Sequence, residues 1–117
     1  MINLNYLKNK TVLVTGGTGT FGRALVSKLL KEADIKKVII FSRDEFKQDE
    51  MQKDLVGQGI YKDKKIRFFI GDVRDLPRLE RAFNGVDIVF HAAALKQVPA
   101  IEYNPFEAVK TNILGSQ

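Results

Sequence analysis

The sequence contains no cysteine among its 117 residues, which excludes a disulfide scaffold, a thiolate metal site and a cysteine nucleophile. It also lacks a long hydrophobic run, because runs such as Val38–Phe41 fall well short of the roughly 20 apolar residues that cross a bilayer. The first residues carry no secretory pattern, so we expect a cytoplasmic protein. No repeat or linker interrupts the chain, and with 44% hydrophobic and 28% charged residues it has the balance of one soluble globular domain.

The chain also lacks a concentrated patch of positive charge, although its formal net charge is +5, from 19 Lys and Arg against 14 Asp and Glu. Such an excess could serve nucleic acid, an anionic lipid surface or a small phosphorylated ligand. Acidic residues are interleaved with the basic ones, as in Lys47–Glu50 and Arg74–Asp75, and there is no basic stripe or aromatic platform. We therefore predict no nucleic-acid partner and no membrane partner.

What the chain does contain is an alternation of strand-like and helix-like segments. Four short runs rich in branched apolar residues are typical of buried strands: Thr11–Thr15, Lys37–Phe41, Lys65–Ile70 and Val86–His91. This alternation predicts parallel strands joined by right-handed crossovers, with helices on both faces of one sheet. The predicted fold class is α/β, a Rossmann-like doubly wound parallel sheet that is truncated after about four strand–helix units.

Between these runs lie segments that carry sequence signals of a helix, and the strongest signal is in the first. Four apolar residues of the first recur at helical spacing and are predicted to face the sheet: Phe21, Ala24, Leu25 and Leu29. A last helix is predicted to begin at Asn104–Glu107, where a capping side chain precedes a proline at the first helical position.

A glycine-rich segment joins the first strand to the first helix. It reads Thr15-Gly16-Gly17-Thr18-Gly19-Thr20-Phe21-Gly22 and contains both GxGxxG and TGxxGxxG. Dinucleotide sites need glycine there because the turn is tight, the backbone approaches a pyrophosphate and the helix packs closely on the strand. The helix N-terminus adds unpaired N–H groups and partial positive charge. In this strand–turn–helix setting the segment predicts a dinucleotide site, and a glycine turn without a ligand is the alternative.

The end of the second strand bears on which dinucleotide binds. An acidic side chain there usually holds the ribose 2′-hydroxyl of NAD. Here Ser42 and Arg43 follow the strand, and a hydroxyl beside a guanidinium suits a 2′-phosphate. Asp44 and Glu45 come next, and because either carboxylate could hold a ribose 2′-hydroxyl, NAD remains an alternative cofactor. We predict NADP, with NAD as the less favoured cofactor.

Polar and small residues also follow the third and fourth strands. Asp72 and Val73 are placed to hold an adenine, by a carboxylate that accepts from its amine and an apolar cover, although the same pattern fits a turn. After the fourth strand, Ala92–Ala94 let a cofactor lie against the backbone. His91 is the only histidine, and a hydrogen-bonded structural role is favoured over a catalytic one. Lys96 is a candidate to contact ribose, phosphate or an anionic substrate.

Taken together, these motifs resemble the extended short-chain dehydrogenases/reductases. More narrowly, the chain is similar to the UDP-N-acetylglucosamine 4,6-dehydratases that serve bacterial polysaccharide and flagellin-sugar synthesis. The narrower resemblance rests on three segments and their continuation: Ser42–Gln48, Gly71–Asp75, His91–Pro99 and Glu102–Asn112. It implies a lyase that converts UDP-N-acetylglucosamine or a similar sugar nucleotide, with inversion at C5, into a 4-keto-6-deoxy sugar nucleotide.

The resemblance also implies roles for individual residues. The pyrophosphate loop would comprise Gly16, Thr18, Gly19, Thr20, Phe21 and Gly22. The 2′-phosphate region would comprise Ser42, Arg43, Asp44, Glu45, Phe46 and Lys47. Adenine would lie against Asp72 and Val73, and the ribose and nicotinamide against Ala92, Ala93, Ala94, Lys96 and Thr111. Lys96 would also contact the substrate, and no metal is implied.

The catalytic residues of that family, an Asp-Lys pair and a Tyr-x-x-x-Lys motif, have no counterpart in this sequence. None of Tyr6, Tyr61 and Tyr103 has a lysine four residues on, so we assign no catalytic residue. We therefore expect residues 1–117 to be an NADP-binding Rossmann domain, the N-terminal part of a larger, homo-oligomeric enzyme whose catalytic part lies elsewhere. A sugar-nucleotide 4-epimerase of the same superfamily and a non-catalytic NADP-binding module are the alternatives.

Overall fold

The computed structural model describes residues 5–92 and the backbone of residues 96–99. Its elements, in chain order, are β1 (Thr11–Thr15), α1 (Thr20–Glu32), β2 (Lys37–Ser42), α2 (Glu45–Gly57), β3 (Ile66–Ile70), α3 (Leu76–Ala82), β4 (Ile88–His91) and β5 (Lys96–Pro99). The four strands predicted from the apolar runs are all present, with boundaries that differ by two residues or fewer. The helix predicted at Asn104–Glu107 lies outside the described residues.

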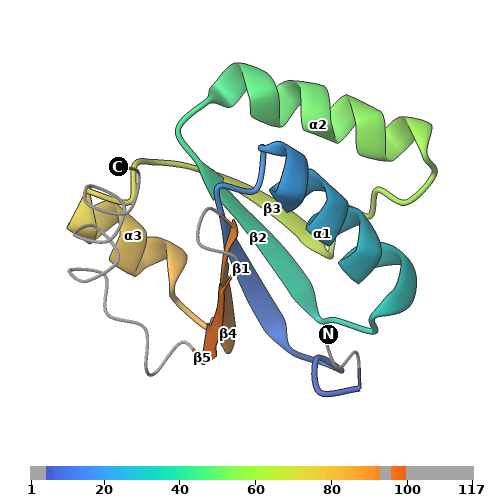
Figure 1. The fold of residues 1–117 in the computed structure, drawn as a ribbon, viewed down its shortest axis with the longest axis horizontal. Coiled ribbons are helices and arrows are strands. Elements are labelled where there is room, and N and C mark those ends of the chain that lie inside the picture. Colours follow the sequence, from blue (N-terminus) through green and yellow to red (C-terminus); the bar gives the residue numbers. More distant parts are fainter. Residues whose placement is uncertain (1–4, 93–95, 100–117) are drawn as a thin grey trace.

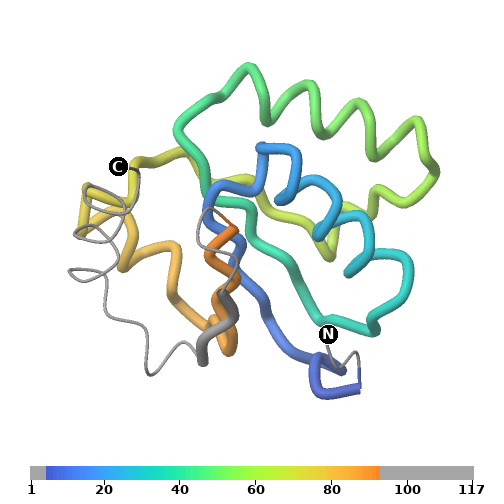
Figure 2. Tube along the Cα trace, viewed as in Figure 1, coloured from blue at the N-terminus to red at the C-terminus, as the bar shows by residue number. Residues whose placement is uncertain are grey.

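The strands form one sheet in the order β3-β2-β1-β4-β5. The first four are parallel to one another, with β1 at the centre paired to both β2 and β4. Helices α1 and α2 lie on one face of the sheet and α3 lies on the other (Figures 1 and 2). This arrangement confirms the predicted α/β Rossmann-like fold, because each helix is the crossover between two parallel strands.

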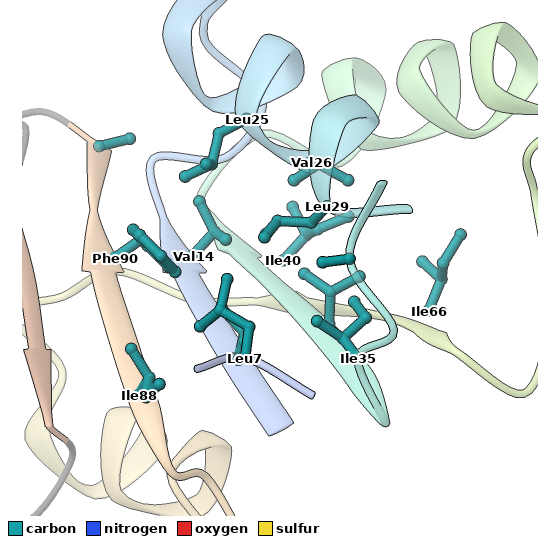
Figure 3. Packing of buried hydrophobic residues seen from close by; sticks show 14 of the residues in the cluster. Leu7, Val14, Leu25, Val26, Leu29, Ile35, Ile40, Ile66, Ile88 and Phe90 are labelled. Carbon is teal, nitrogen blue, oxygen red and sulfur yellow. The ribbon is translucent and has the colours of Figure 1, made fainter. Parts of the chain in front are cut away.

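Each face of the sheet has its own apolar core, because successive strand residues point to opposite sides. Toward α1 and α2, Val14 and Ile40 pack with Leu25, Val26 and Leu29 (Figure 3). Toward α3, the second core comprises Leu13, Ile39, Phe41, Phe69, Leu79, Ala82 and Val89. Both faces are therefore covered, which explains why the strand sequences are continuously apolar instead of alternating.

The prediction for the buried face of α1 was wrong at two of its four positions. Phe21 is 48% exposed and Ala24 is also exposed, whereas the buried residues are Gly22, Leu25, Val26 and Leu29. The orientation follows from Gly22, where an added Cβ would lie 2.5 Å from the Cα of Gly17. This close approach turns the Gly22 side of α1 toward the sheet and leaves Phe21 outside.

β5 departs from the predicted all-parallel arrangement. It pairs antiparallel with β4, so that Lys96 lies opposite His91 and Pro99 opposite Ile88. Only four residues separate the two strands, whereas a parallel crossover needs about a dozen. Proline cannot donate to a ladder, and its place in an edge strand agrees with that limit.

No helix in the described residues has the length and apolar character needed to cross a bilayer.

Two glycine substitutions test the packing of α1. Gly22→Ala should lower the free energy of unfolding by about 2 kcal/mol or more, because the added methyl collides with the backbone of the loop. Gly57→Ala, at the end of α2, is the matched control, since nothing lies within 4 Å of its Cβ position. It should be neutral or slightly stabilising. Thermal unfolding measures both, and equal melting temperatures for the two variants would contradict the close approach.

Candidate dinucleotide-binding site

The carboxyl ends of β1, β2 and β3 meet at one edge of the sheet, where the chain enters α1 and α2 (Figure 1). Backbone hydrogen bonds fix the meeting point. Gly16 N–H donates to the carbonyl of Phe41 at 3.0 Å, and Gly71 N–H donates to the carbonyl of Ser42 at 2.9 Å. The three segments that the sequence singled out are thus held together by the sheet, at the place where open α/β sheets bind ligands.

A cavity of about 610 Å³ lies at this edge. Its lining residues are Thr15, Gly16, Thr18, Gly19, Phe41, Ser42, Arg43, Asp44, Lys47, Gly71, Asp72, Val73, Arg74 and His91. The volume is in the range of pockets that hold small ligands and cofactors. Nine of the lining residues belong to the set predicted from the sequence, and they come from all three strand ends.

Other predicted site residues lie away from this cavity or outside the described part of the chain. Those described but not lining it are Thr20, Phe21, Gly22, Glu45, Phe46 and Ala92. Phe46 is 70% exposed, whereas Ala92 is buried. Side chains of Ala93, Ala94, Lys96 and Thr111 lie outside the described residues, so their assignment to the nicotinamide side remains a prediction.

The glycines of the loop have separable roles. Gly16 has a φ of +69°, a backbone conformation that residues other than glycine rarely adopt. A Cβ at Gly17 would lie 2.8 Å from Ile40 Cγ2, and one at Gly22 would collide with the loop backbone. At Gly19, by contrast, the nearest atom would be the Gly16 carbonyl oxygen at an ordinary 3.5 Å. The fold therefore requires glycine at Gly16, Gly17 and Gly22, whereas Gly19, which lines the cavity, could accommodate a Cβ without a clash within the fold.

The start of α1 differs from the starts of the other two helices. Asp44 caps α2 by accepting from Lys47 N–H, and Asp75 caps α3 by accepting from Arg78 N–H. α1 has Gly19 at its N-cap, no side-chain cap and no acidic residue in its first turn. The N-cap side chain therefore does not occupy the first N–H groups of α1, which directly follow the cavity-lining Gly19, and an anion site at a helix start uses such groups.

Asp72 is held as a carboxylate by two arginines. Arg74 donates to it from Nη2 at 2.8 Å and from its backbone N–H at 2.9 Å, and Arg43 Nη1 lies 3.7 Å from Asp72 Oδ2. The hydrogen bond from the Arg74 side chain is the main cause that lowers the pKa of Asp72 from 3.8 to about 2. At neutral pH the group only accepts hydrogen bonds, which suits the exocyclic amine of an adenine.

Arg23 ties the glycine loop to the segment that follows β2. Its Nε donates to the Thr18 carbonyl at 3.0 Å, and its Nη2 donates to the Lys47 carbonyl at 3.3 Å. Glu50 lies 3.9 Å from the same guanidinium. One side chain of α1 therefore bridges the predicted pyrophosphate and 2′-phosphate regions, a role that the sequence pattern did not reveal.

His91 is hydrogen-bonded, which agrees with the structural role favoured from the sequence, but it also lines the cavity, so that role stays a prediction. Its Nδ1 lies 2.6 Å from Thr15 Oγ1, and both side chains are buried where β4 pairs with β1. Among the described residues, no three His, Asp or Glu side chains gather as a metal site would require.

The described site fits the adenosine end of a nicotinamide dinucleotide. Gly16, Thr18 and Gly19 line the cavity where the pyrophosphate would lie, Ser42 with Arg43 and Lys47 can receive a 2′-phosphate, and Asp72 with Val73 can receive the adenine. Besides the predicted residues, the cavity brings in Thr15, Phe41, Gly71, Arg74 and His91. Gly71 and Arg74 could have been found from the sequence, since they lie within two residues of Asp72.

The fold and this strand-end cavity define a Rossmann-like α/β domain with a candidate dinucleotide site. Within that class, the chain belongs to the family described as "Polysaccharide biosynthesis protein", whose pattern matches residues 12–117. The sequence-based recognition is thereby confirmed at the level of the polysaccharide biosynthesis family.

Individual relatives agree with that assignment. A protein of Rickettsia bellii named UDP-glucose 4-epimerase is 53% identical over 112 residues, which is 93% of this chain and 31% of the relative. The X-ray structure of Pen from Bacillus thuringiensis is 46% identical with a TM-score of 0.67, and the match covers 96% of this chain and 32% of that one.

A more distant structure supports the fold. It is a short-chain dehydrogenase/reductase from Veillonella parvula in complex with NADP, 20% identical with a TM-score of 0.53, over 70% of this chain and 34% of that one. The chain thus spans about a third of the length of the curated relatives and similar structures that it matches.

Arg74→Ala tests the arrangement at Asp72. The variant should raise the pKa of Asp72 toward 3.8, since it removes the guanidinium that stabilises the carboxylate. In the wild type the lowered pKa adds stability above about pH 4, and that contribution is lost as the pH falls toward 2. NMR titration of the side-chain carboxyl measures the shift. Arg81→Ala, an exposed arginine of α3, is the control and should leave the Asp72 titration unchanged.

Proposed function

We propose that the described residues form the adenosine half of an NADP site in an enzyme that acts on a sugar nucleotide. The observation that carries this proposal is the cavity where Ser42, Arg43 and Lys47 lie beside the glycine loop and Asp72. Ser42 and Arg43 at the end of β2 and Lys47 in the first turn of α2 are hydrogen-bond donors, which suit a 2′-phosphate because it only accepts hydrogen bonds when ionised. The site supports NADP binding on chemical grounds that are independent of the family name.

The acidic residues after β2 give weaker support to NAD. Asp44 lines the cavity, but its carboxylate already accepts from Lys47 N–H at 3.1 Å as the cap of α2. Glu45 lies in the first turn of α2, is exposed and does not line the cavity. A carboxylate accepts more than one hydrogen bond, so Asp44 could still accept from a ribose 2′-hydroxyl, although its role as a cap fixes where the group points. NAD is therefore the second candidate.

For the reaction, we propose 4,6-dehydration of UDP-N-acetylglucosamine or a similar sugar nucleotide. When bound, NADP supplies a hydride acceptor and then a hydride donor, so that it is regenerated in each turnover. C4 gives up a hydride and its hydroxyl gives up a proton, so that C4 becomes a ketone. C5 then loses a proton, and the C6 hydroxyl takes up a proton and leaves as water. The hydride returns to C6 and a proton is added to the opposite face of C5, which gives the inverted 4-keto-6-deoxy product. The motifs of Ser42–Gln48 and His91–Pro99 support this choice.

A sugar-nucleotide 4-epimerase is the second candidate reaction. It is favoured by the names of relatives about half identical to this chain, which are called UDP-glucose 4-epimerases. Both reactions begin with loss of hydride from C4, and they differ in whether C6 keeps its hydroxyl. The residues described here bind the cofactor in either case, so they do not discriminate between the two.

In both proposals residues 1–117 act as the NADP-binding part of the enzyme, and the catalytic Asp-Lys pair and Tyr-x-x-x-Lys motif belong to other residues. Lys96 is proposed to reach both cofactor and substrate, and Ala92–Ala94 and Thr111 to lie on the nicotinamide side. A homo-oligomer is proposed for the complete enzyme. If the protein at its natural length has no such motif, the non-catalytic NADP-binding module replaces the enzyme proposal.

Cofactor choice is tested by calorimetric titration with NADP and NAD in parallel. The wild type should bind NADP more tightly, and Arg43→Ala should weaken NADP binding about tenfold or more while leaving NAD binding nearly unchanged, because it removes a charge-assisted contact to phosphate. Arg81→Ala removes the same charge outside the cavity and should leave both affinities close to those of the wild type. Equal loss of NADP and NAD affinity in Arg43→Ala would argue against a 2′-phosphate contact.

The reaction is tested on the protein at its natural length, incubated with NADP and either UDP-N-acetylglucosamine or UDP-glucose. Mass spectrometry should detect a product of UDP-N-acetylglucosamine that has lost one water, and NMR should show a methyl group at C6. An isomer of unchanged mass would favour the epimerase. Unchanged substrates, with NADP binding retained, would favour the non-catalytic module.

A further inference from the structure

Gln48 is a buried amide to which the proposed function assigns no role of its own. It lies in the first turns of α2, is 4% exposed, and faces the ends of β2 and β3. Its Nε2 lies 2.9 Å from Ser42 Oγ, 3.2 Å from the Phe69 carbonyl oxygen and 3.4 Å from the Ser42 carbonyl oxygen. A polar side chain is buried in a small domain only where hydrogen bonds compensate for the lost contact with water, so the partners of Gln48 indicate its role.

The surroundings fix which way the amide group points. Both carbonyl oxygens can only accept hydrogen bonds, so the nitrogen of Gln48 must face them. An amide nitrogen donates and does not accept. The short contact to Ser42 is therefore one in which Gln48 Nε2 donates and the Ser42 hydroxyl oxygen accepts.

This direction determines what the Ser42 hydroxyl can offer. Its oxygen is occupied by Gln48, and its proton remains for a different acceptor. Ser42 is 8% exposed and lines the cavity. Within the described residues, no hydrogen bond donated by Ser42 Oγ is found, so the proton is available on the cavity side.

We propose that Gln48 is a positioning residue for NADP specificity, which holds the Ser42 hydroxyl as a hydrogen-bond donor to the 2′-phosphate. The inference rests on the proposed function and extends it by a residue that does not line the cavity. Without the amide, the carbonyl oxygens of Phe69 and Ser42 lose the hydrogen bonds that Gln48 donates to them. The Ser42 hydroxyl then turns toward these oxygens, and its proton no longer points to the ligand. An ionised phosphate accepts without donating, so it loses most from this turn.

The test compares two probes, 2′,5′-ADP and 5′-AMP, by calorimetry on the protein at its natural length. The ratio of their affinities isolates the 2′-phosphate contribution. Gln48→Met, of similar length and without a donor, should lower this ratio about tenfold and leave 5′-AMP binding nearly unchanged. Gln52→Met, on the exposed side of the same helix, is the matched control and should keep the wild-type ratio.

A second pair of variants separates positioning from a general structural effect. Ser42→Ala should lower the ratio to the same extent as Gln48→Met, and the double variant should lower it no further, because both act through one hydroxyl. Circular dichroism and thermal unfolding check that each variant folds. If Gln48→Met does not fold, Ser42→Ala still decides, since an unchanged ratio in that variant overturns the inference.

The outcomes distinguish this inference from the proposal on which it rests. A wild type that binds 2′,5′-ADP no better than 5′-AMP would refute the 2′-phosphate site itself. A wild type that prefers 2′,5′-ADP, with the preference retained in Gln48→Met or with additive losses in the double variant, would overturn the role of Gln48 alone.

Discussion

The parallel register of the central strands is the constraint on which the site depends. Because β1, β2 and β3 run in the same direction and end together, two backbone hydrogen bonds, from Gly16 to Phe41 and from Gly71 to Ser42, are enough to bring three distant loops to one edge. The apolar cores on both faces keep that register, since a slip of one residue would turn each strand's side chains to the wrong side. The parallel pairing of the strands thus determines which side chains meet at the site.

Much of this arrangement could be predicted from the sequence because the signals are local. Continuous apolar runs identify buried parallel strands, and the position of the glycine loop after Thr15 places a phosphate site at a helix start. Ser42, Arg43 and Asp72 were recognised for the same reason, since each lies at the carboxyl end of a strand or within two residues of it. For these residues sequence position and spatial position are linked by the fold class itself.

The remaining features depend on contacts between segments far apart in the chain, and no local pattern encodes them. The exposed side of α1 was mispredicted because Gly22, which carries no apolar side chain, sets the helix orientation through its approach to Gly17. The antiparallel β5 was missed because its strand is only four residues long and follows an alanine-rich stretch. Gln48 and Arg23 were likewise missed, since polar residues of helices are usually solvated and only the structure shows what they bridge.

The ion pair between Arg43 and Asp72 affects how the pocket treats small anions. Arg43 is 72% exposed on its side chain, yet it is already in contact with a carboxylate before any nucleotide arrives. An inorganic phosphate or sulfate offers only charge, so it must compete with Asp72 for the guanidinium and leaves that carboxylate with one partner fewer. A nucleotide bound as proposed brings a phosphate for the arginine and an amine for the aspartate together, and exchanges both partners at once. A nucleotide bound in this way would therefore replace both partners of the pair, whereas a free anion would replace only one.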